Sequence, residues 1–145
     1  MKFTIDKRIL TEAVGNLQRA VSTKTSIPAL EGILIRTDVE KIILSAYDLE
    51  IGMQTELPAV ISAPGAIILT ARLFSEIVRK SPAEDVTVES DDRNTATITS
   101  GVSCFTIIGM NAAEFPEFPK ITDTDTLRLP ANVLKSMIRQ TLFAI

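Results

Sequence analysis

Apolar residues recur at helical spacing between positions 70 and 82 of the chain. The i, i+3, i+4 pattern in this stretch predicts an amphipathic helix whose apolar face packs against a core. Thr70 is placed to act as the N-cap, and the helix should end at Ser81 because a residue before proline is driven out of the α region. The predicted apolar face consists of Leu73, Phe74, Ile77 and Val78.

Two further stretches show the same pattern, each after a short alternating strand. Residues 3–5 lead through the N-cap Asp6 into a predicted helix over 7–21, and residues 127–129 lead through Pro130 into one over 131–145. The three helices would begin at residues 7, 71 and 131, at intervals of 64 and 60 residues. This recurrence favours an internal repeat whose unit is a half-domain. The apolar stripes are Leu10, Ala13, Val14, Leu17 and Val21 in the first helix and Leu134, Met137, Ile138 and Leu142 in the last.

Elsewhere the apolar residues alternate with period two, which predicts strands. The strands are expected over 32–37, 41–46 and 50–57 in the first half, and over 67–69, 86–89, 95–99 and 102–108 in the second. The order is βαβββ twice, an α+β fold. Residues 111–119, with two prolines, are predicted as an irregular linker. On the last strand, Phe105 and Ile107 are either ordinary core or part of an edge strand that meets a second subunit.

The basic residues are concentrated on the three predicted helices. The whole chain has 15 basic and 18 acidic residues, a net charge of −3. The helices hold eight basic and two acidic residues, a net of +6, so the rest of the chain sums to −9. Such a cationic face can attract a polyanion, and a solvated helix surface is the alternative interpretation. The basic residues are Lys7, Arg8, Arg19, Arg72, Arg79, Lys80, Lys135 and Arg139.

The composition argues against several kinds of catalytic and metal site. The chain has no histidine, the commonest general base and metal ligand, and it has no phosphate-binding glycine motif. Asp48 and Glu50 lie two residues apart without a partner base, so a turn with side chain-to-backbone bonds is favoured over acid–base catalysis. We expect no catalytic residue, no metal and no cofactor.

Length and the single cysteine set the broad class. A chain of 145 residues has the size of one ordinary domain. No apolar run approaches the roughly 20 residues of a membrane span, and the first residues show no signal-peptide core. We therefore expect a cytoplasmic protein without membrane contact. Cys104 allows no internal disulfide, and its strand-like surroundings predict that it is buried.

Six segments in register resemble the bacterial sliding clamp family, the beta subunits of DNA polymerase III. The segments are MKFTID, IPAL, YDLEIGM, TARLFSEI, MNAAEFPEFP and LRLPANVLKSMIRQTLFAI, and together they extend over the chain. The resemblance implies a DNA-clamp fold of duplicated βαβββ half-domains, with sheets outside and basic helices on one face. It also implies a first clamp domain over residues 1–120 and the start of a second over residues 121–145.

The resemblance further implies a non-enzymatic processivity factor of the replicative polymerase. Members of the family encircle duplex DNA as a head-to-tail homodimer and tether the polymerase. The implied partners are double-stranded DNA, and the DNA polymerase III alpha subunit and clamp loader, which bind through a peptide cleft. A ring holds DNA by enclosure, so its charges need only sequence-independent attraction to phosphates.

The resemblance assigns roles to individual residues. Lys24 falls where family members often have a DNA-touching arginine, and lysine keeps the charge without the planar fork. Arg72 and Arg79 match cations of the helices that line the DNA hole, and Lys135 and Arg139 would lie on the first such helix of the second domain. The resemblance places Phe105 and Ile107 on the strand that meets the other subunit.

The chain is short for the implied family, so the function of a full-length clamp and that of this chain are separate questions. The sequence stops at residue 145, early in the implied second domain, so we expect a fragment that cannot close a ring and lacks most of the peptide cleft. We also expect the last helix to lack a partner sheet for its apolar stripe. The alternative is a stand-alone, sequence-independent DNA-binding domain, and an enzyme that uses Asp48 and Glu50 ranks last.

Overall fold

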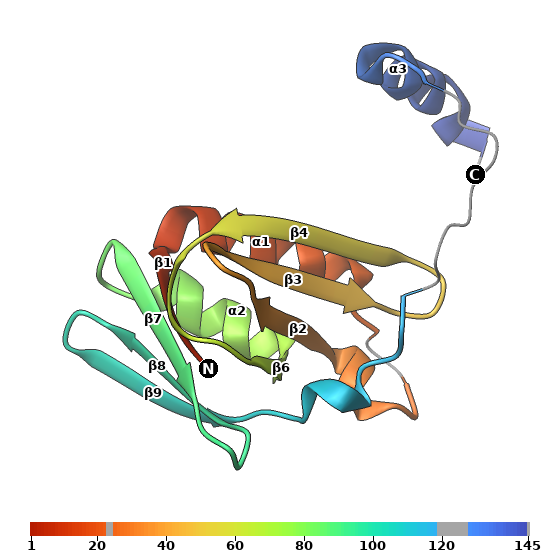
Figure 1. Cartoon of the computed structure of the whole chain (residues 1–145). Helices are drawn as coiled ribbons and strands as arrows, with labels where there is room; N and C mark the ends of the chain where they lie inside the picture. Colours follow the sequence, from red (N-terminus) through yellow and green to blue (C-terminus); the bar gives the residue numbers. More distant parts are fainter. Residues whose placement is uncertain (23–24, 119–127, 145) are drawn as a thin grey trace.

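The computed structural model describes residues 1–22, 25–118 and 128–144, and Figure 1 shows their secondary structure. The first half of the chain forms β1 (Lys2–Asp6), α1 (Lys7–Leu17), β2 (Gly32–Thr37), β3 (Lys41–Tyr47) and β4 (Gly52–Pro58), followed by a short β5 (Val60–Ala63). The second half forms β6 (Ala66–Thr70), α2 (Ala71–Lys80), β7 (Asp85–Ser90), β8 (Thr95–Ser100) and β9 (Ser103–Ile108). The predicted βαβββ repeat is confirmed.

The two halves exchange their first strands. The five-stranded sheet has the order β5-β1-β7-β8-β9, so β1 joins the three strands that come after α2. The four-stranded sheet has the order β4-β3-β2-β6, so β6 joins the three strands that come after α1. All pairings are antiparallel. Because of this exchange, neither half can complete its sheet without the other.

One apolar core lies between the sheets and the two helices. Figure 1 shows α1 and α2 behind the four-stranded sheet, and strand alternation directs Ile33 and Ile35 of β2 into this core. Leu34, between them, belongs to a separate cluster on the other face of the same sheet. The helices contribute Leu10, Ala13, Val14 and Leu17 from α1, and Ala71, Phe74, Ile77 and Val78 from α2.

The two helix starts differ from each other. Asp6 caps α1 as predicted, because its Oδ1 accepts hydrogen bonds from the backbone N–H groups of Arg8 at 2.7 Å and Ile9 at 3.4 Å. Thr70 precedes α2 but its hydroxyl makes no capping bond, so that prediction is wrong. The helix ends before Ser81 as expected. Leu73 was predicted on the apolar face, yet it is 45% exposed, because the buried stripe of α2 runs through its neighbour Phe74.

Strand β5 and the end of the first helix were not predicted. Residues 60–63 are too short for an alternation signal, and they become a strand by pairing with β1. The α-helical part of the first helix ends at Leu17, and a 3-10 turn continues over Gln18–Ala20. The strand predicted from residue 50 begins at Gly52, because Glu50 and Ile51 lie in the preceding turn.

Residues 109–118, here called the strap, pack on the outer face of the four-stranded sheet. Met110 forms an isolated bridge with Ile68 of β6, with N···O distances of 2.9 and 3.1 Å. Phe115 is buried in the cluster on this face, and Phe118 packs against the same cluster. The sequence predicted this stretch as an irregular linker. The described part is irregular apart from one 3-10 turn over Ala112–Glu114, and its two phenylalanines bury apolar surface on the sheet, a contact that the sequence did not predict.

The last described element is α3 (Ala131–Thr141), with a 3-10 turn over Leu142–Ala144. The predicted helix is confirmed, but Arg128 and Leu129 form no strand, and Leu127 lies outside the described residues. The proposed domain boundary at residue 120 also lies outside them. The apolar stripe of α3 is exposed at Leu134, Met137, Ile138 and Leu142. Across the described part of the chain, no helix is long and apolar enough to cross a membrane.

Candidate nucleic-acid interface

Helices α1 and α2 form an antiparallel pair that is joined by a hydrogen bond at each end. At one end, Lys7 Nζ donates a hydrogen bond to the carbonyl oxygen of Ser81 at 2.6 Å. At the other end, Gln18 Nε2 donates to the carbonyl oxygen of Ala71 at 3.2 Å. The start of each helix therefore lies beside the end of the other, and their solvent-facing residues form one surface.

This surface carries cations at its two ends and acids in the middle. Exposed positions on α1 and its 3-10 extension include Arg8, Glu12 and Arg19, spaced so that they lie along one side of the helix. On α2 the corresponding positions begin at Arg72 and end at Arg79, with the half-buried Glu76 between them. Because the helices are antiparallel, Arg8 lies at the Arg79 end and Arg19 at the Arg72 end. We call these two groups the cationic ends of the helix pair.

The ion pairs on this surface leave the guanidinium groups accessible. Arg8 Nη2 lies 3.2 Å from Asp6 Oδ2, and Arg72 Nε lies 3.7 Å from Glu76 Oε1, with the two arginine side chains 90% and 89% exposed. The hydrogen bond from Arg8 lowers the pKa of Asp6, and the same contact raises the pKa of Arg8. Exposed pairs of this kind contribute little and compete weakly with a polyanion.

The other predicted DNA-binding residues have different surroundings. Lys7 is half-buried with its ammonium group on the Ser81 carbonyl, so the structure gives it a role in joining the helices. Lys80 lines a groove beside β9. Lys24 lies outside the described residues. Lys135 and Arg139 are exposed on α3, four residues apart.

The sequence did not predict the two hydrogen bonds that join the helices. Gln18 carries no charge, and nothing in the sequence pattern says which carbonyl it would reach.

Strand β9 is an outer strand of the five-stranded sheet, as the edge-strand interpretation requires. Phe105 is 37% exposed, whereas Ile107 is 8% exposed, and both line a groove of about 390 Å³ between β9 and α2. The exposed Leu73 of α2 lines the same groove. Cys104 is exposed on β9, so the prediction that it is buried is wrong: the outer strand turns it away from the core.

The carboxylates at 48 and 50 form a turn. Asp48 Oδ1 accepts hydrogen bonds from the backbone N–H groups of Glu50 at 2.9 Å and Ile51 at 2.6 Å, and Leu49 has a φ of 79°. These backbone bonds, chiefly that from Ile51, lower the pKa of Asp48. The side-chain oxygen is committed to holding the turn, which supports the turn interpretation over acid–base catalysis.

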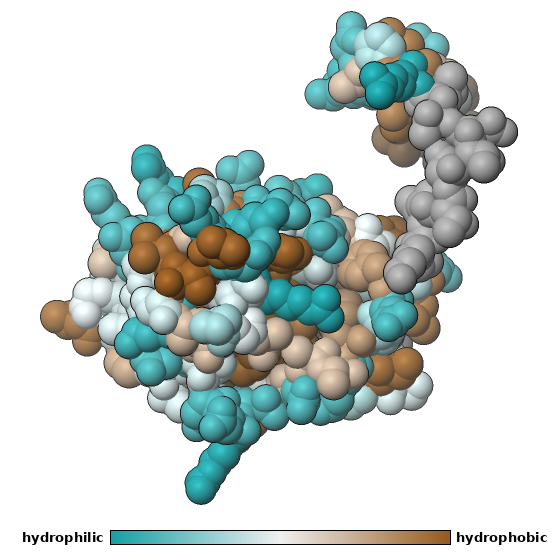
Figure 2. Space-filling model, in the orientation of Figure 1, coloured by the Kyte–Doolittle hydropathy of each residue, from teal (hydrophilic) through white to brown (hydrophobic). Residues whose placement is uncertain are grey.

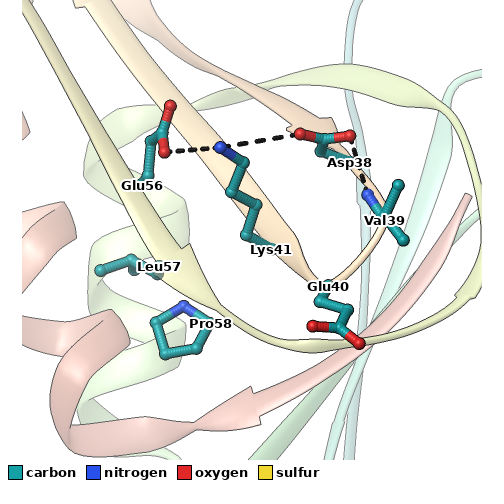
Figure 3. A pocket seen from close by; sticks show the side chains of 7 residues that line it. All are labelled: Asp38, Val39, Glu40, Lys41, Glu56, Leu57 and Pro58. Carbon is teal, nitrogen blue, oxygen red and sulfur yellow. Dashed lines mark hydrogen bonds and ion pairs between the residues drawn. The ribbon is translucent and has the colours of Figure 1, made fainter.

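A second acidic group surrounds a pocket of about 520 Å³ at the β2–β3 turn (Figure 3). Lys41 Nζ lies 2.7 Å from Glu56 Oε2 and 3.7 Å from Asp38 Oδ2, and the bond to Glu56 is the main reason that the pKa of Lys41 is raised. Val39 and Val60 are 85% and 71% exposed. Figure 2 shows apolar patches among hydrophilic surface over the end of the four-stranded sheet where β4 finishes. The lysine neutralises much of the acidic charge, and the described lining residues include no serine, threonine or cysteine that could act as a nucleophile.

Metal ligation finds no support in the part of the chain that is described: it contains no group of three or more histidine, cysteine, aspartate or glutamate residues placed to hold a metal ion.

Comparison with known proteins identifies the family. Residues 1–119 match the family model for the N-terminal domain of the DNA polymerase III beta subunit. The chain belongs to this family. It is 37% identical to the beta sliding clamp of Bacillus subtilis strain 168, with all of this chain and 40% of the relative covered. It is 36% identical to that of Halalkalibacterium halodurans, with the same coverage.

Solved structures show the same relationship. The Bacillus subtilis DNA polymerase sliding clamp matches with a TM-score of 0.94 and 37% identity, over 99% of this chain and 40% of that structure. A sliding clamp from Bartonella birtlesii bound to griselimycin matches with a TM-score of 0.77 and 27% identity, over 83% of this chain and 32% of that structure. The α+β clamp fold is thereby confirmed. The chain spans about 40% of the length of the curated relatives it matches.

Proposed function

We propose that this chain is part of a sliding clamp, a non-enzymatic processivity factor that encircles duplex DNA and tethers the replicative polymerase. Family membership supports the role. The observation that carries it to particular residues is the hydrogen-bonded α1–α2 pair, which presents Arg8, Arg19, Arg72 and Arg79 on one surface of an otherwise acidic protein. A surface of this kind attracts phosphates without reading sequence, as a sliding ring requires.

The two cationic ends are suited to separate phosphates. A ten-residue helix such as α2 is about 15 Å long, so its ends are farther apart than adjacent phosphates on one strand. The acidic middle, with Glu12 and Glu76, limits how tightly the surface holds DNA. Weak, distributed attraction lets the duplex slide, whereas a continuous cationic strip would retain it.

We propose that β9 meets a second subunit in a head-to-tail homodimer. Its outward edge has backbone groups suited to strand pairing, and Phe105, Ile107 and Leu73 give the adjacent groove an apolar lining. We further propose that residues 1–120 form the first clamp domain and 121–145 begin a second. Strap docking up to Phe118 and the end of the family match at residue 119 support this division.

The remaining partners belong to the whole protein. We propose that the whole protein acts in the cytoplasm and binds the DNA polymerase III alpha subunit and the clamp loader through a peptide cleft. Most of this cleft would be built from the region of full-length clamps that this chain does not span. The griselimycin complex of the Bartonella birtlesii clamp supports the presence of a ligand site in that relative.

The proposed DNA surface can be tested by NMR. Duplex DNA is added to the labelled chain at low salt, and the salt concentration is then raised. We expect shifts concentrated at Arg8, Arg19, Arg72 and Arg79, fading as salt increases. Shifts centred on the strands would contradict the assignment of the helix face.

Charge variants sharpen this test. Replacing Arg72 and Arg79 with Gln should weaken DNA binding. It should also make the slope of the logarithm of the binding constant against the logarithm of the salt concentration shallower by roughly 0.9 for each phosphate that is no longer neutralised. The matched control is Arg93→Gln in the exposed β7–β8 turn, which should leave the slope unchanged. An equal effect of both changes would mean that only net charge matters. Tight binding of the chain alone to linear duplex DNA would instead favour a stand-alone DNA-binding domain.

A further inference from the structure

Glu76 of α2 borders both the proposed DNA surface and the groove beside β9. Its carboxylate Oε1 lies 3.7 Å from Nε of Arg72, which stands at one cationic end of the helix pair. The same residue lines the groove of about 390 Å³ between α2 and β9, next to the edge that is proposed to meet a second subunit. One side chain therefore touches both surfaces.

The contact between Glu76 and Arg72 is weak enough to be exchanged. A separation of 3.7 Å exceeds the roughly 2.7–3.2 Å of N–H···O hydrogen bonds, so charge attraction alone holds the pair. The arginine side chain is 89% exposed and that of Glu76 is 42% exposed, so water screens this attraction. A DNA phosphate would offer the guanidinium group a stronger, charge-assisted partner. Contact with a phosphate would therefore release Glu76.

A second cation lies within reach of Glu76 on the same helix. Lys80 follows Glu76 by four residues, as Arg72 precedes it by four, and residues at this spacing are neighbours on a helix surface. Lys80 also lines the groove, and it belongs to none of the five ion pairs among the described residues. A glutamate that precedes its cation by four residues makes the better pair of the two orders. Because both pairings are exposed and weak, they differ little in free energy.

The pairing of Lys80 affects how readily the groove accepts an apolar partner. When Glu76 stays with Arg72, a partner that covers the groove must remove water from an unpaired ammonium group, which is costly. When Glu76 pairs with Lys80, the two charges compensate each other and this cost falls. The rest of the groove lining is mostly apolar and includes Leu73, Ile77, Phe105 and Ile107.

We propose that Glu76 exchanges between Arg72 and Lys80 and thereby couples DNA contact to subunit docking at β9. A phosphate on Arg72 moves Glu76 to Lys80 and prepares the groove for the second subunit. By reciprocity, a docked subunit favours the Glu76–Lys80 pair and leaves Arg72 free for DNA. Exposed ion pairs are weak, so each event should raise the affinity of the other by no more than about fivefold. Glu76 is thus a positioning residue, and the inference rests on the proposed DNA surface and subunit contact.

The exchange is tested first without DNA, by NMR of the ε-methylene group of Lys80 in the whole chain. Arg72→Gln removes the present partner of Glu76, so the Lys80 signal should shift as the new ion pair forms. The matched control is Arg19→Gln, which removes an exposed cation from the same end of the helix pair. In the double variant Arg72→Gln, Glu76→Gln the shift should be absent. An unmoved Lys80 signal in Arg72→Gln, or an equal shift in the control or the double variant, would overturn the proposal.

Duplex DNA at low salt then tests the coupling. DNA added to the unmodified chain should shift the Lys80 ε-methylene in the same direction as Arg72→Gln does, together with the methyl groups of Ile77 and Ile107 in the groove. In Glu76→Gln, the DNA-induced shift at Arg72 should remain, while the shifts at Lys80 and in the groove are lost. A Lys80 shift of equal size in Glu76→Gln would mean that Lys80 contacts DNA directly, and it would overturn the coupling.

This inference and the proposed function fail in different ways. If DNA shifts Arg72 but leaves Lys80 and the groove unchanged, the DNA surface stands and the coupling is overturned. If DNA shifts no residue of either cationic end, the proposed DNA surface is contradicted and the coupling falls with it. The variants without DNA decide separately whether Glu76 exchanges its partner.

Discussion

The two halves of the molecule share an order of elements but end differently. Each half has a first strand, a helix with four buried apolar residues and three antiparallel strands. After its third strand, the first half continues as β5 along β1. The second half makes only the Met110–Ile68 bridge with β6 and then becomes the aromatic strap. The position beside the exchanged strand is thus filled by a paired strand in the first half and by a single backbone bridge in the second, after which the strap crosses the outer face of the sheet.

This difference shows which features of a repeat are essential. The exchanged strands and paired helices bury one common core, so they recur in both halves. The segment after the third strand lies outside this common core and takes a different course in each half. Two solutions are tolerated there because each removes apolar surface and backbone groups from water. Four sets of substitutions test this comparison.

The largest effect should come from the core that the halves share. Phe74→Ala in α2 should reduce the free energy of unfolding by about 3–5 kcal/mol and Leu10→Ala in α1 by about 2–5 kcal/mol, since both side chains are fully buried. Chemical denaturation should show a single transition in each variant. Two separate transitions would show that the halves fold independently and would contradict a common core.

The strap should be sensitive to the glycine beneath it. Gly52→Ala places a methyl group against the Phe118 ring and should destabilise the protein by about 1–3 kcal/mol. The matched control is Gly15→Ala in α1, where nothing lies within 4 Å of the added carbon, and where alanine should stabilise by about 0.5–1 kcal/mol. In a Phe118→Ala background, most of the cost of Gly52→Ala should disappear. Thermal unfolding of the four variants measures this, and a persistent cost would place the strain elsewhere.

The helix starts should respond unequally. Asp6→Ala removes an oxygen that accepts two backbone hydrogen bonds, whereas Thr70→Ala removes a hydroxyl that makes no capping bond. We therefore expect a clear loss of thermal stability for Asp6→Ala and a change within about 0.5 kcal/mol for Thr70→Ala. Equal losses would mean that Thr70 caps α2 in solution.

The smallest effect should be on the acid dependence of the unfolding free energy, through the Asp6 cap of α1. The pKa of Asp6 is lowered in the folded protein from its usual 3.8, so its contribution is present above that value and lost as the pH falls through the lower, folded pKa. Asp6→Asn keeps a capping oxygen but removes the titration. The variant should show a flatter decline in unfolding free energy below about pH 4. An unchanged acid profile would assign the decline to other carboxylates, including Asp48.

Much of the secondary structure could be predicted because the deciding forces are local. The alternation in residues 2–6 and the apolar stripe at 10, 13, 14 and 17 indicate which side of each element is buried. The Asp6 cap and the Asp48 turn depend on side-chain oxygens within three residues of their donors. Of the proposed DNA surface, the arginines could be identified individually, but their grouping into two cationic ends required the antiparallel pairing of α1 and α2.

The failures share a different cause. Leu73 and Cys104 are exposed because their elements stand at the margin of the core, which no local pattern reveals. Strand β5 forms by pairing with β1, and the packing of the strap on the sheet was likewise not predicted. In each case the deciding contact joins residues far apart in the sequence.

By itself, the sequence determined the half-domain repeat, most of the helices and strands and the separation of basic helices from an acidic remainder. These features arise from residue periodicity and charge, which short segments carry within themselves. Only the tertiary structure decided that the first strands are exchanged, that Lys7 joins two helices and that the strap packs on the outer face of the four-stranded sheet. Those outcomes depend on which surfaces meet, as when the amino terminus of Met1 donates to the carbonyl of Ser90 across 89 residues. Such long-range meetings are chosen by the packing of the whole chain.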